Sequence, residues 1–252
     1  MSLKTVIARS AATKQSRSGH AEDFERRFMD RPYGMGVDST MFTGIISEMG
    51  SVIQARTVSS GMQLAIQCAA AESSKVGDSI AVNGACLTVT KLDGNVFHAD
   101  VTRETLTKTT LGSLRPGDKV NIELPVAAGE RFGGHFVLGH VDTVGIVKEK
   151  RNEGNSVVMG FSGPREFMKY LVPKGSVAVD GVSLTVTEVS ETAFWVSLIP
   201  HTLAVTTLGI RSVGDTVNLE ADTISKHVYS YVNARGGGVT LDLLQRTGFM
   251  ED

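Results

Sequence analysis

Short runs in which apolar and polar residues alternate recur through most of the chain. In the run SIAVNGACLTVT at residues 79–90, Cys86 and Thr88 point to one face of an extended chain, while Leu87 and Val89 point to the other. Alternation with a period of two residues is typical of a strand that buries one face and exposes the other. The chain is therefore predicted to consist mainly of half-buried β-strands.

This pattern occurs twice, because SVAVDGVSLTVT at residues 176–187 repeats the first run 97 residues later. Residues 77–123 and 174–220 share 20 identities in 47 pairs without a gap, too many for unrelated segments. The two halves therefore derive from one ancestor and are expected to share one fold.

The duplication extends upstream with a slightly different spacing. Gly44-Ile45-Ile46 aligns with Gly139-His140-Val141 at a distance of 95 residues, so the second copy has gained about two residues. We expect this insertion in the polar loop Arg151–Asn155.

Turn signals and periodicity suggest how each copy folds. Asn83-Gly84 and Asp180-Gly181 predict two-residue hairpin turns, since a type I′ turn needs positive φ at both central positions. Several short strands at this spacing favour a small closed barrel or a sandwich. One short helix per copy is predicted, at Ala69–Ser74 and at Pro164–Leu171.

Both ends of the chain lie outside the duplication. Residues 1–40 are polar and partly basic, a composition that also occurs in transit peptides, but we expect an extension without ordered structure before a natural start at Met41. Near the other end, four apolar residues at helical spacing predict an amphipathic helix that stops before Gly236. They are Ile224, Val228, Tyr231 and Val232. A second short helix is predicted at Leu241–Arg246.

Composition narrows the range of functions. With 25 basic and 27 acidic residues the net charge is −2, which indicates no general attraction to nucleic acid or to anionic membranes. No apolar run approaches the roughly 20 residues that span a bilayer. The two cysteines, Cys68 and Cys86, form no CxxC or metal-binding spacing and fit the reducing cytoplasm. Phosphate-loop, dinucleotide-binding and nucleophile-elbow motifs are absent from the sequence.

Polar residues that recur in both copies are the first candidates for ligand binding. Thr88 and Thr185, with Cys86 and Ser183, occupy matching positions beside the hairpins, where hydroxyls and backbone amides can bind the carbonyls and ring nitrogens of a heterocycle. Any single threonine is also simply a good strand residue, and Cys86 alone is explained as a small buried side chain. The matched pairs favour binding.

Residues that differ between the copies are the second group of candidates. His135 and His140 lie in GGHFVLGH, and a histidine can transfer protons near neutral pH or be held by backbone groups in a strand. His140 aligns with Ile45, and Arg103-Glu104 aligns with Pro200-His201. A division of labour between the copies is expected at such positions. No carboxylate or thiol cluster accompanies the histidines, so a metal site is not expected.

Five ordered motifs give the chain a resemblance to a known family. MFTGII at 41–46, NGACLTV at 83–89, GGHFVLGHVD at 133–142, DGVSLTV at 180–186 and IPHTL at 199–203 closely resemble riboflavin synthases. The resemblance covers roughly residues 41–235.

The resemblance implies two six-stranded Greek-key barrels, a C-terminal helix and a homotrimer. The expected domains are the extension 1–40, barrels at 41–136 and 137–222, and a helix and tail at 223–252 that trimerise the chain. The family converts two 6,7-dimethyl-8-ribityllumazine molecules into riboflavin and a diaminopyrimidine, without metal, flavin or nicotinamide cofactor. Lumazine synthase is a further candidate partner.

The resemblance also assigns site residues. Proton transfer is expected from His140, with Ser79 and Cys86 near the electrophilic ring carbon, Phe42 closing the pocket and Asp222 assisting polar steps. The N-terminal pocket is expected to use Gly44, Ile45, Ile46, Cys86, Leu87, Thr88, Asp100, Val101, Thr102, Arg103, Glu104 and Thr105. The C-terminal pocket is expected to use Gly139, His140, Val141, Lys174, Ser183, Leu184, Thr185, Ser197, Leu198, Ile199, Pro200, His201 and Thr202.

Two other classes of protein remain as alternatives. A non-catalytic lumazine- or flavin-binding protein shares the duplicated fold but needs only one complete pocket, whereas both copies here keep the LTVT strand and its polar cluster. A barrel-type flavin reductase is disfavoured, because no segment resembles a nicotinamide domain.

Overall fold

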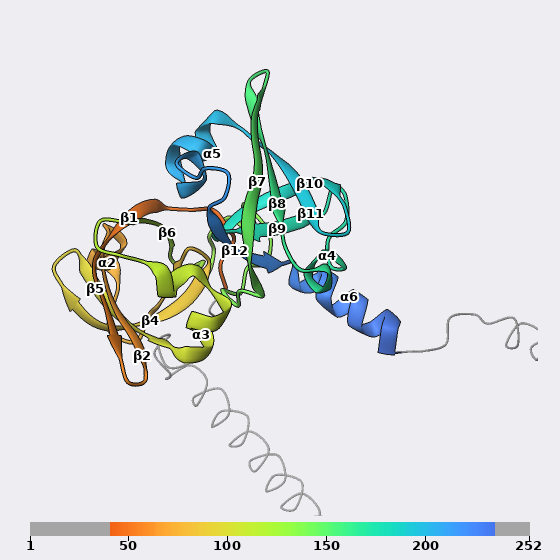
Figure 1. The fold of residues 1–252 in the computed structure, drawn as a ribbon. Helices are drawn as coiled ribbons and strands as arrows, with labels where there is room; N and C mark the ends of the chain where they lie inside the picture. The colour runs from red at the N-terminus through yellow and green to blue at the C-terminus, as the bar shows by residue number, and fades with distance from the viewer. Residues whose placement is uncertain (1–40, 235–252) are drawn as a thin grey trace, which may run out of the picture. The chain divides into compact units, whose positions relative to one another are not determined.

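The computed structural model describes residues 41–234. The N-terminal extension and the helix predicted at 241–246 lie outside the described residues. The described chain forms two closed antiparallel barrels, visible side by side in Figure 1, followed by the helix α6. The prediction of a mainly β chain with two barrels is confirmed.

The first barrel has six strands in the spatial order β1-β2-β5-β4-β3-β6. They are β1 (Glu48–Val58), β2 (Gly61–Gln67), β3 (Ser79–Val82), β4 (Ala85–Asp93), β5 (Val96–Thr102) and β6 (Lys119–Glu123). The second barrel repeats this order with β7 (Thr143–Glu153), β8 (Ser156–Ser162), β9 (Ser176–Val179), β10 (Val182–Val189), β11 (Ala193–Leu198) and β12 (Thr216–Ala221).

Alternation along the strands places the apolar residues inside. Leu87 and Val89 on β4 are buried in the first barrel, and Leu184 and Val186 on β10 are buried in the second. Each barrel thus has its own hydrophobic core, as expected for barrels small enough to be filled by side chains. Closure also leaves no long unpaired edge strand within either barrel.

Each copy has more helix than we predicted. The expected helices are α2 (Ala70–Ser73) and α4 (Arg165–Met168), and the C-terminal helix is α6 (Thr223–Ala234). The prediction of one helix per copy is wrong, because α3 (Arg103–Lys108) follows β5 and α5 (Pro200–Val205) follows β11. A short 3₁₀ turn comes after each of them, at Thr110–Ser113 and Thr207–Gly209.

The insertion in the second copy does not lie where we expected it. The elements β7, β8 and α4 all keep the spacing of 95 residues from β1, β2 and α2, and the spacing becomes 97 only at β9. The extra residues therefore lie between Met168 and Val172, not in the loop Arg151–Asn155. There Tyr170 packs edge-on against Tyr229 of α6, with ring centroids 5.3 Å apart. The insertion thus helps to hold the C-terminal helix, which runs past α4 in Figure 1.

The two predicted hairpin turns meet at the contact between the barrels. Asn83 and Asp180 both have φ of 46°, and the glycines after them have φ of 76° and 79°, as a type I′ turn requires. A Cβ on Gly84 would lie 2.7 Å from the backbone nitrogen of Gly181, and the reverse distance is also 2.7 Å. Only glycine fits at either position.

Two buried asparagines bond across this contact in a reciprocal pattern. The amide of Asn121 on β6 donates to the Asp180 carbonyl at 2.8 Å, and that of Asn218 on β12 donates to the Asn83 carbonyl at 2.8 Å. Their side-chain oxygens accept from the backbone of Thr207 and Thr110, each at 2.7 Å. Each asparagine therefore links both barrels with all its polar atoms paired, which fixes one relative orientation.

One ion pair breaks the symmetry of this contact. The fully buried Asp180 carboxylate accepts from the Arg211 guanidinium, with its nearest nitrogen at 2.8 Å. Burial raises the pKa of Asp180, and Arg211 opposes that rise. In the first copy Asn83 and Leu114 hold the equivalent positions, and the Asn83 side-chain nitrogen has no hydrogen-bond partner among the described residues. The second copy thus uses a charged pair where the first uses neutral residues.

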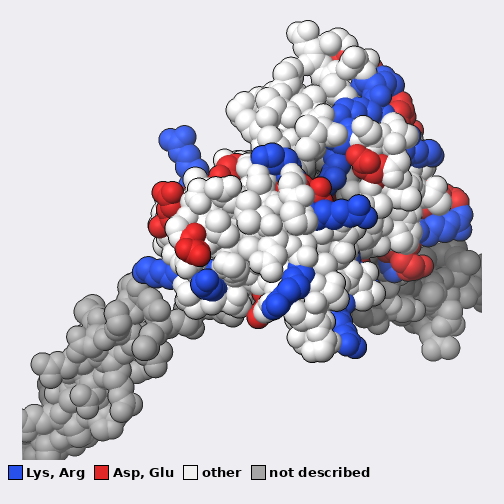
Figure 2. All heavy atoms as spheres, turned by 60° about the vertical axis from the view of Figure 1, so that its left-hand side comes forward, with Lys and Arg blue, Asp and Glu red and all other residues white. Residues whose placement is uncertain are grey.

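The surface carries both signs of charge. Figure 2 shows Lys and Arg scattered among Asp and Glu over one face, with wide uncharged areas between them. Within residues 41–234, no helix is long and apolar enough to cross a membrane.

Arg211→Leu is predicted to lower the free energy of unfolding by about 3 kcal/mol, because it leaves the buried Asp180 without its counter-ion. Adding Asp180→Asn recreates the neutral pair of the first copy and is expected to recover most of the loss. Urea unfolding of the two single variants and the double variant measures the coupling. Purely additive effects would show that the two side chains do not depend on each other.

Candidate functional site

A short segment precedes the first strand of each barrel and contacts the other barrel. The Gly44 carbonyl accepts from the Ser183 backbone N–H of the second barrel at 2.8 Å, and the Gly139 carbonyl accepts from Cys86 of the first at 3.0 Å. Both glycines have φ of 76°, and a Cβ on them would lie 2.6 Å and 2.5 Å from the Cβ atoms of Ser183 and Cys86. Glycine is therefore needed at both crossings.

The residues after these glycines continue into the opposite barrel. Ile46 packs against the core of the second barrel, and Val141 packs against the core of the first. Our grouping of the pocket residues is corrected on this point. Gly44–Ile46 belongs with the site of the second barrel, and Gly139–Val141 with that of the first. A sequence alignment of the copies cannot reveal the exchange, because it assigns each segment to the strands that follow it.

The first site collects residues from three consecutive parts of the barrel and from the exchanged segment. Thr88 on β4 and Asp100 on β5 are exposed on neighbouring strands, with Cys86 half-buried beside Gly139. Thr102 caps α3 by accepting from the Thr105 backbone N–H at 3.2 Å. The exposed Arg103 and Glu104 occupy the first turn of that helix.

The second site repeats this arrangement with fewer charges. Thr185 on β10 and Ser197 on β11 are exposed, Ser183 is half-buried beside Gly44, and Ile199–Thr202 opens α5. In the place of Asp100, Arg103 and Glu104 it carries Ser197, Pro200 and His201. The two sites thus share a backbone frame but differ in electrostatics.

Four of the expected contact residues point away from both sites. Leu87, Val101, Leu184 and Leu198 have buried side chains in the barrel cores. Only their backbone groups are available to a ligand on the outer face. The runs of three to six residues expected from the resemblance therefore divide into alternate outward side chains and inward core residues.

Ser176, which we did not predict as a site residue, is the counterpart of Ser79 in the second copy. Ser79 pairs with Thr88 across β3 and β4, and Ser176 pairs with Thr185 across β9 and β10. Both serines are half-buried. The 97-residue spacing between the copies was the signal that could have identified Ser176.

His135 contacts the second site more directly than the sequence indicated. Its Nδ1 lies 2.7 Å from the Ser183 hydroxyl, while its buried Nε2 has no hydrogen-bond partner among the described residues. Burial lowers the pKa of His135, and the charge of Asp222 opposes this. The imidazole is therefore kept neutral to lower pH than usual, where it can either donate to or accept from Ser183.

The residues expected to act in catalysis are dispersed. His140 is exposed on the segment that reaches the first site. Phe42 is fully buried, bridges to Val137, and packs near Cys86 rather than lining an open pocket. Asp222 caps α6 by accepting from the Ile224 N–H at 2.8 Å. Lys174 is exposed in the turn before β9, in a left-handed conformation with φ of 67°.

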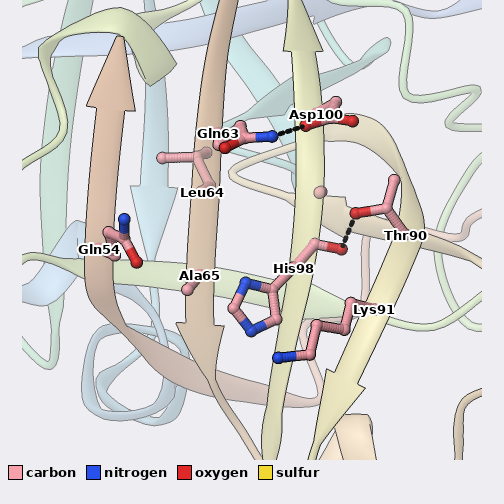
Figure 3. Close-up of a pocket in the computed structure, with 9 residues that line it drawn as sticks. Gln54, Gln63, Leu64, Ala65, Thr90, Lys91, His98 and Asp100 are labelled. Carbon is pink, nitrogen blue, oxygen red and sulfur yellow. Dashed lines mark hydrogen bonds between the residues drawn. The ribbon is translucent and has the colours of Figure 1, made fainter. Parts of the chain in front are cut away.

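A polar pocket lies on the outer face of the first barrel and shares Asp100 with the first site. Figure 3 shows Gln63 donating to Asp100, at 3.0 Å, with His98 and Lys91 farther along the same face. An equivalent pocket on the second barrel is lined by Glu149, Trp195 and Ser197 among others. The outer strand faces are therefore hollowed at matching places in both copies.

Because Ile46 and Val141 pack on the opposite barrels, truncating either side chain is predicted to destabilise the barrel that it contacts. Ile46→Ala should speed backbone amide exchange mainly in β7–β12, although residue 46 precedes the first barrel, and Val141→Ala should do so mainly in β1–β6. Each variant is expected to lose about 1–2 kcal/mol of local stability, since both side chains are only partly buried. Hydrogen exchange followed strand by strand makes the measurement. Effects confined to the barrel nearer in sequence would contradict the exchange.

Comparisons with known proteins agree with this architecture. The model of the lumazine binding domain matches the chain twice, at residues 43–125 and 138–222. Riboflavin synthase of Actinobacillus pleuropneumoniae is 40% identical over 215 residues, covering 83% of this chain and 100% of that protein. Riboflavin synthase of Bacillus subtilis is 40% identical over 213 residues, covering 84% of this chain and 99% of that protein.

A solved structure has the same fold. LumP complexed with 6,7-dimethyl-8-(1′-D-ribityl) lumazine matches with a TM-score of 0.66 and 25% identity, covering 72% of this chain and 99% of that one. The identity to the riboflavin synthases is higher and extends over nearly their whole length. From the two matched domains and these relatives, the chain belongs to the riboflavin synthase family of enzymes.

Proposed function

We propose that the protein is a transferase that converts two molecules of 6,7-dimethyl-8-ribityllumazine into riboflavin and 5-amino-6-ribitylaminouracil. One molecule gives up a four-carbon unit and the other accepts it, so no external oxidant or reductant is needed to balance the reaction. The relatives named above support this activity, and LumP, a structural neighbour, was solved with that lumazine bound.

The observation that carries the proposal is the pair of similar but unequal sites. Two identical substrates need two pockets of one general shape, and the duplicated frames around Cys86 and Ser183 supply them. One molecule must nevertheless become the donor and the other the acceptor. The ionisable residues Asp100, Arg103 and Glu104, present only at the first site, provide a physical basis for that difference.

Specific roles follow for the residues nearest the substrates. His140 is exposed at the first site and is proposed to remove or return the C7-methyl proton. Cys86 and Ser79 are proposed to lie near the ring carbon that the resulting carbanion attacks. The neutral His135, held against Ser183, would orient the ring in the second site. Holding both rings in register lowers the entropic part of the barrier.

The helix α6 supports assembly into a trimer. One face of α6 is tied to its own barrel, since Lys226 pairs with Asp142 at 2.7 Å and Tyr229 packs on Tyr170. The opposite face presents Ile224, Val228, Tyr231 and Val232, all more than half exposed. We propose that this apolar face packs between subunits, in an arrangement in which the first site of one chain meets the second site of a neighbour.

The direct test is incubation of the protein with 6,7-dimethyl-8-ribityllumazine alone. We expect riboflavin absorbance and fluorescence to appear catalytically, at one mole per two moles of substrate and without any added cofactor. Tight binding without turnover, at one ligand per chain, would instead identify a lumazine carrier.

His140→Ala is expected to lower turnover at least tenfold while leaving the fold intact.

The assembly can be tested separately. Val228→Glu together with Val232→Glu should convert the trimer to monomers, because each adds a charge to the apolar face of α6. We expect turnover to fall more than tenfold, while lumazine still binds to each barrel. Light scattering, activity and fluorescence titration make the measurements, with Ser230→Glu on another face of α6 as the control. Full activity in a monomeric variant would exclude a site shared between subunits.

A further inference from the structure

Two buried glutamates hold the exchanged segments, one in each copy. Glu123 ends β6 and Glu220 occupies the same position on β12. Glu123 accepts from the Thr43 backbone at 2.7 Å, from the Thr43 hydroxyl at 2.9 Å and from the Gly44 backbone at 3.0 Å. The segment that reaches the second site is therefore fixed by one carboxylate with both oxygens in use.

The second copy lacks one of these donors. Leu138 stands where the first copy has Thr43, so Glu220 accepts from the Leu138 backbone N–H at 2.8 Å but from no hydroxyl. Its other oxygen, Oε2, is buried and has no hydrogen-bond partner among the described residues. The His140 backbone N–H, two residues on, favours the ionised form of this carboxylate. Glu220 is thus an under-coordinated carboxyl group that is bonded to the segment carrying His140.

The surroundings of Glu220 join the His140 segment to α6. Asp142 accepts from the Ala221 backbone at 2.8 Å and from Lys226 of α6 at 2.7 Å, and its own N–H donates to the Leu219 carbonyl. On its other side, β12 pairs Glu220 with the uncharged Ala178 of β9. His140 therefore lies between Leu138 and Asp142, and each of these two residues is hydrogen-bonded to β12.

We propose that Glu220 is a positioning residue for His140, whose ionised carboxylate holds the segment 138–140 against the first site and whose protonation loosens it. The inference rests on the proposed function. Protonation makes the carboxyl group a weaker acceptor for the Leu138 N–H, because hydrogen bonds to an ionised oxygen are stronger than those to a neutral one. At Glu123 the Thr43 hydroxyl is an additional donor, which opposes the rise in pKa that burial causes.

The electrostatics agree with this geometry. Burial raises the pKa of Glu220 to about 7, with Asp142 adding to the rise while the Leu138 and His140 backbone groups and Lys226 oppose it. The group therefore changes charge near neutral pH. Because its pKa is raised on folding, Glu220 contributes to stability at low pH and loses this contribution as the pH rises through about 7.

The test compares three variants of the full-length trimer by turnover against pH. Leu138→Thr restores the missing hydroxyl and should move the low-pH limb of the turnover profile down by about one pH unit, as one added donor to a carboxylate would. Glu220→Gln should remove this limb and lower turnover roughly tenfold, since a neutral amide oxygen is a weaker acceptor than a carboxylate for the Leu138 N–H. Glu123→Gln is the matched control, and its profile should keep the limb near pH 7 whatever its turnover.

A second readout does not depend on activity. The urea midpoint of the wild type should fall relative to that of Glu220→Gln as the pH rises from about 5 through 7. A turnover limb that stays in place in both Leu138→Thr and Glu220→Gln would assign it to another group, such as His140 itself, and would overturn the proposal. Absence of riboflavin formation in the wild type would instead refute the proposed function, while the urea comparison still tests Glu220.

Discussion

The structure depends on the contact between two glycine turns. Gly84 and Gly181 approach until no side chain fits on either, and Asn121 and Asn218 bond across the contact on both sides of them. Because all the polar atoms of the two asparagines are paired, a different rotation of the barrels would leave buried amides unsatisfied, at a cost of about 1–3 kcal/mol each. Hydrophobic packing brings the barrels together, and this polar pattern selects one orientation.

The exchange of the leading segments is possible only in that orientation. Gly44 and Gly139 each bond to the opposite barrel, so each candidate site includes residues from both copies. Each barrel therefore has its own hydrophobic core but shares its candidate site with the other copy.

Local sequence signals predicted what depends on local physics. The period of two in LTVT, the turn residues Asn83-Gly84 and the helical spacing from Ile224 to Val232 each determine an element within a dozen residues. The helices α3 and α5 were missed because six residues without an amphipathic pattern fall below the length at which a helix is stable alone. The long-range facts, such as Glu123 beneath Thr43 or His135 beside Ser183, join residues 48 to 80 positions apart and leave no periodic trace.

The insertion before β9 makes the two copies unequal as supports for the C-terminal helix. In an exact duplication, the same contacts for a terminal helix would be present on both copies. Here Tyr170 comes from residues present in one copy alone, and Asp142 replaces the serine of the other copy. Among residues 41–234, α6 is therefore held by the second copy alone, so the two barrels expose different surfaces although they share one fold. Two inserted residues thus remove part of the symmetry that the duplication created.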